Sequence, residues 1–199
     1  MRTVLLILCC VGLFVSSKLN TTSLNVGDKA IDFTLKNVDG KMVSLSDFKD
    51  AKGYIVVFTC NTCPYAQAYE DRIIALDKKY APQGYPVVAI NPNDVEAKPG
   101  DSFEKMKERA KEKDFPYPYL IDTEQKVTRT YGASRTPHVF LLGKDLVVRY
   151  IGAIDNNYQN ASAATEKYVE DAIEALKSGK EVETNFTKAI GCTIKWKES

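Results

Sequence analysis

Two short runs of continuous apolar residues constrain the fold of this chain more than any other feature. Residues 54–58 are all aromatic or β-branched, and residues 86–90 form a second run of largely apolar residues. A strand with one exposed face alternates polar and apolar residues, whereas a continuous apolar run suits a strand that is buried on both faces. The sequence therefore predicts a central sheet with helices on both sides.

Amphipathic segments alternate with these strands. Apolar residues recur at helical spacing after the first run and predict a helix from near Cys63 to before Pro82: Tyr65, Tyr69, Ile73, Leu76 and Tyr80. The same reasoning predicts helices at 101–113, with Asp101 as N-cap, near 124–131 and at 163–178, and strands at 119–121, 138–142 and 146–151. A hairpin of 31–36 and 41–45 around Asp39-Gly40 precedes them. The expected fold class is α/β, with a mixed sheet in a single domain over residues 18–199.

The first 17 residues have the order of a secretory signal peptide. Arg2 is followed by an apolar run over residues 4–15 and then by two serines. The run is shorter than the ~20 residues of a membrane-spanning helix. We therefore expect cleavage after Ser17 and export to a periplasmic or other extracytoplasmic compartment. A permanent anchor and a lipid attachment at Cys9 or Cys10 are the weaker alternatives.

Charge and composition exclude several classes of function. Lys and Arg number 27 against 26 Asp and Glu, so the net charge of +1 predicts neither a nucleic-acid partner nor a membrane surface as partner. A single histidine excludes multi-histidine metal sites within the chain. Without the leader, three cysteines remain, Cys60, Cys63 and Cys192. The chemistry is therefore expected on sulfur.

Cys60 and Cys63 lie where the buried strand 54–58 gives way to the long helix. Reactive groups gather at this edge of an α/β sheet, and the amide groups of a first helical turn stabilise a thiolate. We expect Cys60 to be the exposed, attacking sulfur and Cys63, partly buried, to resolve the mixed disulfide. A structural disulfide is an alternative, but closing four residues contributes only about 2 kcal/mol. A zinc site of Cys60, Cys63, Cys192 and His138 is another.

A second motif, Arg135-Thr136-Pro137-His138, stands directly before a predicted strand. Together with Cys60 and Cys63 it resembles the active site of the thioredoxin superfamily. The resemblance implies a cis peptide bond before Pro137 and a substrate groove shaped by Thr136 and Pro137. Since proline has no N–H, the Thr136 backbone is free to pair with a bound chain. The alternative interpretation is that Pro137 only begins an edge strand.

The resemblance extends over nearly the whole mature chain. Residues 25–35, the turn at 39–41 and residues 44–48 are similar to the opening of the alkyl hydroperoxide reductase and thiol-specific antioxidant branch. Membership implies a thioredoxin fold with an added N-terminal hairpin, and disulfide reduction or exchange as the activity. It requires no organic cofactor or metal. The implied partners are a disulfide-bearing protein or small molecule and an upstream thiol reductant or oxidant.

Departures from the family pattern leave alternatives open. Neither Cys60 nor Cys63 is preceded by the Pro-x-x-x-Thr/Ser-x-x-Cys pattern of peroxiredoxins, because the third residue before each is Val57 and Cys60. A thiol peroxidase is therefore the second hypothesis, and a non-catalytic binding domain the third. Cys192 resembles a tail cysteine of peroxiredoxin-like members. It is interpreted either as a buried structural residue or as a third, resolving thiol.

Overall fold

The structure is a computed structural model that describes residues 23–198. The predicted signal segment, with Cys9 and Cys10, lies outside these residues. Within them, no helix is both long and apolar enough to span a membrane.

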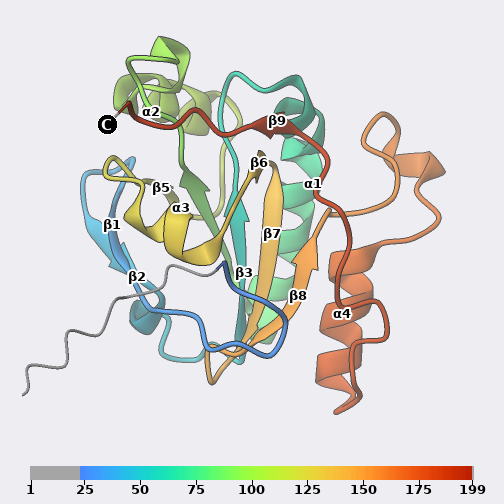
Figure 1. Cartoon of the computed structure of the whole chain (residues 1–199). Helices are drawn as coiled ribbons and strands as arrows, with labels where there is room; N and C mark the ends of the chain where they lie inside the picture. The colour runs from blue at the N-terminus through green and yellow to red at the C-terminus, as the bar shows by residue number, and fades with distance from the viewer. Residues whose placement is uncertain (1–22, 199) are drawn as a thin grey trace, which may run out of the picture.

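A seven-stranded mixed sheet forms the centre of the molecule (Figure 1). Its strands, in spatial order, are β2 (Met42–Ser44), β1 (Thr34–Asn37), β5 (Tyr119–Ile121), β4 (Val87–Asn91), β3 (Gly53–Phe58), β7 (His138–Gly143) and β8 (Val148–Gly152). The central strand β3 runs parallel to β4 and antiparallel to β7. All residues of β3 and β4 are buried, which confirms the prediction drawn from the two apolar runs.

Helices cover both faces of the sheet. Alternate residues of β3, such as Ile55 and Val57, pack with α1 (Pro64–Tyr80), α4 (Tyr168–Lys177) and Met106 of α2 (Phe103–Glu112). The intervening residues, such as Val56 and Phe58, pack with α3 (Lys126–Tyr131) and the N-terminal segment. The predicted hairpin is present as β1 and β2, and β2 forms the edge of the sheet. The predicted α/β class and mixed sheet are confirmed.

Two sequence predictions about helix starts are wrong. The last helix begins at Tyr168 and not at residue 163, since Ala161–Ala163 form a separate 3-10 turn. Asp101 does not cap α2, whose N-cap is Ser102. The Asp101 side chain is fully buried and turned instead toward the loop that carries the cysteines.

A short second ribbon was not predicted. It joins β6 (Arg135–Thr136) to β9 (Cys192–Thr193) in antiparallel register, with Thr136 opposite Cys192. In Figure 1 this red C-terminal segment crosses the top of the molecule beside β6 and the start of α1. The ribbon therefore brings the third cysteine to the end of the sheet where the first two lie.

Candidate redox site

The two cysteines of the CxxC motif lie in the loop between β3 and α1. Cys63 is the N-cap of α1, and Pro64 occupies the first turn, where a missing N–H is tolerated. Cys60 stands three residues earlier, outside the helix. The two cysteines and Cys192 are free thiols.

The predicted partner motif meets both sulfurs. The Thr136 hydroxyl lies 3.2 Å from Cys60 Sγ, and Cys63 Sγ donates to the Thr136 carbonyl oxygen at 3.0 Å. The peptide bond between Thr136 and Pro137 is cis, as the resemblance implied. Residues separated by more than seventy positions in the chain thus form one site, and Thr136 lies directly against the two cysteines.

Contacts around the pair favour a thiolate on Cys63. Hydrogen bonds from the Cys60 thiol, the Cys192 thiol and the backbone N–H groups of Ala66 and Cys192 outweigh burial and lower the pKa of Cys63 to about 4. The pKa of Cys60 is raised, first by its hydrogen bond to Cys63, then by burial and by the charge of Asp101. The contacts therefore favour the negative charge on Cys63 over Cys60, and it is the protonated form of Cys63 that donates to the Thr136 carbonyl oxygen.

The expected exposure of Cys60 is wrong. Cys60 is 3% and Cys63 2% exposed, so neither sulfur is open to solvent in this arrangement. The N-terminus of α1 stabilises negative charge on Cys63 and not on Cys60, because the helix begins directly after Cys63. Both sulfurs are buried because they pack with Ala66, Tyr65 and Cys192 and lie against Thr136.

Asp101 holds the loop between the cysteines, a role that the sequence analysis missed. Its Oδ1 accepts the backbone N–H groups of Asn61 at 2.9 Å and Thr62 at 3.0 Å. Its Oδ2 accepts the Thr62 hydroxyl at 2.9 Å and the Asn93 side-chain amide at 2.7 Å. One buried carboxylate thus satisfies four donors and fixes the loop backbone. In the sequence, Asp101 follows Pro99-Gly100 and precedes a predicted helix, which is the usual position of a helix cap. Nothing in the sequence indicates that its carboxylate instead binds the cysteine loop.

Cys192 completes a cluster of three sulfurs. Its backbone N–H donates to Cys63 Sγ at 3.4 Å, and its side chain packs against the cluster of Cys60, Cys63 and Ala66. Burial, followed by the contact with Cys63, raises the pKa of Cys192 to about 11. Cys192 is therefore a protonated neighbour of the Cys63 thiolate, and it is half-buried.

His138 is not part of a ligand set. Its Nδ1 accepts the Ser134 N–H at 3.3 Å, and its ring packs on Phe140. Burial lowers the pKa of His138 to about 4, so the ring is neutral. Across residues 23–198, no group of three or more His, Cys, Asp or Glu side chains is arranged to hold a metal. The zinc hypothesis is not supported by these residues.

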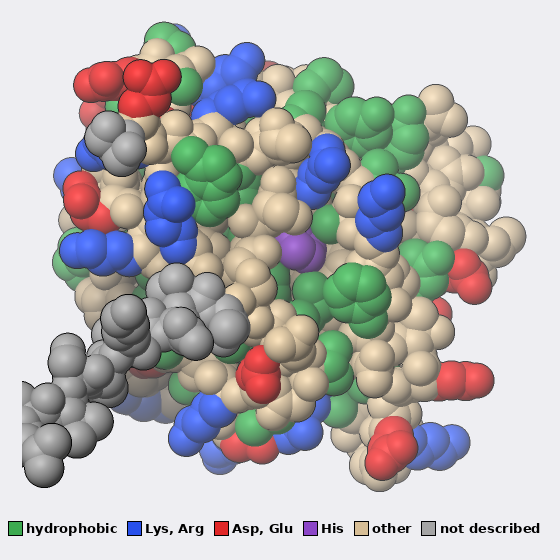
Figure 2. Space-filling view, in the orientation of Figure 1, with side chains coloured by type: hydrophobic (Ala, Val, Ile, Leu, Met, Phe, Trp, Pro, Cys, Tyr) green, Lys and Arg blue, Asp and Glu red, His purple; other side chains and the backbone are tan. Residues whose placement is uncertain are grey.

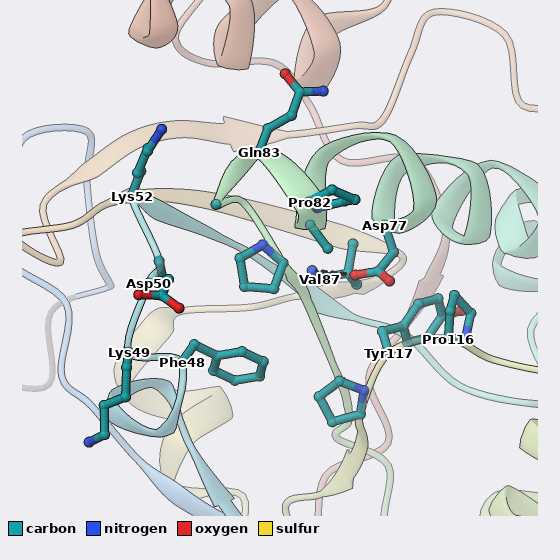
Figure 3. Close-up of a pocket in the computed structure, with 15 residues that line it drawn as sticks. Phe48, Lys49, Asp50, Lys52, Asp77, Pro82, Gln83, Val87, Pro116 and Tyr117 are labelled. Atoms are coloured by element: carbon teal, nitrogen blue, oxygen red, sulfur yellow. Dashed lines mark hydrogen bonds between the residues drawn. The ribbon is translucent and has the colours of Figure 1, made fainter.

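A cavity of about 560 Å³ lies at the other end of the sheet, and no cysteine lines it (Figure 3). Its walls come from the loops before β3, β4 and β5, the first residue of β4 and the C-terminal part of α1, and include Lys52, Asp77, Val87 and Tyr117. The cavity and the cysteines are therefore separate features of the molecule.

The surface around the cysteine end carries no dominant charge. Figure 2 shows Lys and Arg side chains interspersed with Asp, Glu and apolar groups on this face. This mixture agrees with the near-neutral net charge of the chain. Electrostatic attraction alone would not select a partner for this face.

Comparison with known proteins identifies the family. The sequence model of the AhpC/TSA family matches residues 26–151. The thiol-disulfide oxidoreductase ResA of Geobacillus thermodenitrificans is 30% identical over 158 residues, which cover 76% of this chain and 84% of that protein. An uncharacterized conserved protein from Geobacillus kaustophilus has a similar crystal structure, with a TM-score of 0.82 and 38% identity over 88% of this chain and 94% of that chain.

A putative thioredoxin from Neisseria meningitidis shares the fold alone. Its TM-score is 0.57 at 20% identity, over 76% of this chain and 89% of that chain. The mixed sheet, the helices on both faces and the CxxC loop facing a cis proline agree with this likeness. The chain has a thioredoxin fold and belongs to the AhpC/TSA family.

Proposed function

We propose that this protein is a thiol-disulfide oxidoreductase that exchanges disulfides through Cys60 and Cys63, with Thr136 and Pro137 forming one wall of the substrate site. The observation that carries the proposal is the contact of both sulfurs with Thr136, directly before the cis proline. The names of the relatives support the same class of reaction. The leader-like residues 1–17 support export, and residues 18–199 form the single exported domain in this proposal. The proposed partner is a disulfide-bearing protein or small molecule.

The contacts around Cys63 support one order of steps for the proposed reaction. The Cys63 thiolate attacks one sulfur of the partner disulfide, and the other partner sulfur leaves with the electron pair and takes up a proton. Cys60 then loses its proton and attacks Cys63, which releases the partner as a thiol and closes the Cys60–Cys63 disulfide. An upstream thiol reductant returns the pair to two thiols. The sequence favours the reverse roles, so the assignment of Cys60 as attacker stays a prediction to be tested against this one.

Single-sulfur variants test the proposal and the order. We would measure turnover of insulin or glutathione disulfide by the full chain, and trap mixed disulfides in a background with Cys9, Cys10 and Cys192 replaced by Ser, which leaves only the two thiols of the pair. We expect Cys60→Ser to accumulate a mixed disulfide on Cys63 and Cys63→Ser to form none. Lys52→Ala, in the distant cavity, is the matched control and should keep the full rate.

The other outcomes discriminate between the hypotheses. A mixed disulfide that forms only when Cys63 is replaced would assign the attack to Cys60. Failure of the unmodified chain to exchange any disulfide would favour the non-catalytic binding domain, for which the burial of both sulfurs is the main argument. Peroxide consumption faster than disulfide exchange, with a thiol reductant present, would favour the peroxidase.

A further inference from the structure

The C-terminal segment occupies the position where a bound chain would pair with the site. Cys192 and Thr193 run antiparallel to Arg135 and Thr136, in register with the residue before Pro137. An extended peptide that binds a thioredoxin-fold groove by strand addition would use the same backbone edge. A segment of the chain itself therefore takes the place of a substrate strand.

The fit of this segment is close. A Cβ added to Gly191 would overlap the Thr136 carbonyl oxygen, so only glycine permits this approach. The Arg135 guanidinium donates to the Gly191 carbonyl oxygen at 3.0 Å. The Arg135 side chain thus holds the tail in place.

The segment also positions a thiol. Cys192 sits opposite Thr136, with its N–H on Cys63 Sγ and its side chain packed against the cluster of Cys60, Cys63 and Ala66. Two cysteines therefore lie beside Cys63, Cys60 from its own loop and Cys192 from the tail. This is the position that the cysteine of a disulfide-bearing peptide would need in order to exchange with Cys63.

The tail is fastened on both sides of Cys192. Downstream, Ile194 is buried, and the Lys195 N–H donates to the Asn93 side chain at 2.9 Å. Asn93 in turn donates to Asp101, so one network holds both the cysteine loop and the tail. Upstream, the Thr187 hydroxyl accepts the Ala153 N–H at 2.9 Å. The stretch between Thr187 and Ile194 is thus a strap drawn across the two sulfurs.

We infer that residues 188–193 are a built-in substrate: Cys192 exchanges with a disulfide at Cys63, and an outside partner reaches the pair only when this strap lifts. In the exchange, the Cys192 thiolate attacks Cys63 Sγ of the Cys60–Cys63 disulfide, the Cys63–Cys192 bond forms, and Cys60 leaves with the electron pair. The proton lost by Cys192 passes to Cys60 or to water. No oxidant is needed beyond the partner disulfide of the proposed function, on which the inference rests.

Disulfide mapping of the full chain tests the exchange. After oxidation with glutathione disulfide at low protein concentration, we expect peptides linked through Cys63 and Cys192 as well as through Cys60 and Cys63. Cys60→Ser should convert almost entirely to the Cys63–Cys192 form within one chain. Free Cys192 in oxidised Cys60→Ser, with glutathione retained on Cys63, would overturn the exchange.

A second pair of variants tests the strap. Gly191→Ala should lift the segment, and we expect at least a severalfold faster alkylation of Cys63 by iodoacetamide together with loss of the Cys63–Cys192 peptide. Thr184→Ala, an exposed residue upstream of the strap, is the matched control and should behave as the unmodified chain. Equal alkylation rates in all three proteins would overturn the strap, and thermal unfolding would identify a variant that has simply lost the fold.

The two proposals fail in different ways. If Cys192→Ser still reduces glutathione disulfide while no Cys63–Cys192 bond forms in any variant, the tail inference is wrong and the exchange at Cys60 and Cys63 stands. If neither the unmodified chain nor Cys192→Ser reacts with any disulfide, the proposed function itself is wrong.

Discussion

The two ends of the central sheet differ in how they treat negative charge. At the carboxyl end of β3, hydrogen-bond donors converge on Cys63 and lower its pKa to about 4. At the amino end of β4, Asp77 faces the large cavity and accepts only the Val87 N–H at 2.9 Å, and burial raises its pKa. The end with the 560 Å³ cavity is thus the end less prepared to stabilise an anion. The convergence of donors supports the proposed site at the cysteines, and the presence of a cavity does not favour the other end.

The largest expected effect is the titration of Cys63. With a pKa near 4, the reduced protein should carry one thiolate per chain at neutral pH, which absorbs near 240 nm, and lose it as the pH falls through about 4. An ordinary cysteine, with a pKa of about 8.5, would be a thiol throughout this range. Cys63→Ser should remove the signal. A signal that first develops above pH 8 would show that the donors do not stabilise the charge.

A matched pair of aspartate variants compares the two ends directly. Asp101→Asn should lower the free energy of unfolding by about 2 to 4 kcal/mol, because an amide offers one acceptor oxygen to a set of four donors. Asp77→Asn keeps its single acceptor and loses a charge that burial disfavours, so its change should stay within about 1 kcal/mol. Urea denaturation at pH 7 measures both. Equal losses would contradict the contrast between the ends.

The smallest effect concerns His138 at the cysteine end. The folded protein keeps this ring neutral down to about pH 4, whereas the unfolded chain takes up a proton near the ordinary pKa of 6.5. The stabilising contribution is therefore complete above pH 6.5 and is lost as the pH falls toward 4. This ring alone should contribute about 2 kcal/mol to the loss of stability between pH 7 and pH 5, in addition to the loss linked to the Cys63 thiolate.

His138→Asn is the control for this acid sensitivity. It keeps an acceptor for the Ser134 N–H and removes the titrating ring, so the decline between pH 7 and pH 5 should become markedly shallower. Asp77→Asn should leave the decline in place. An unchanged slope in His138→Asn would assign the acid sensitivity to other groups.

Local pattern was enough to predict most of the fold. The continuous apolar runs at residues 54–58 and 86–90 became β3 and β4, and the apolar stripe after Cys63 became α1. These elements could be predicted because a strand buried on both faces, or a helix buried along one stripe, produces a recognisable pattern of apolar residues within a short stretch of sequence. The start of α4 and the role of Asp101 were mispredicted, since both depend on contacts with distant loops.

The sequence by itself determined the candidates: a CxxC pair at a strand-to-helix junction, a Thr-Pro motif and a third cysteine near the C-terminus. Only the tertiary structure decided how they meet. Thr136 lies between two sulfurs more than seventy residues away, and Cys192 arrives from the other end of the chain through the ribbon of β6 and β9. The charge that Cys63 favours depends on both kinds of neighbour, because Cys60 and the Ala66 N–H lie close in sequence whereas Cys192 is brought from the far end of the chain by the fold.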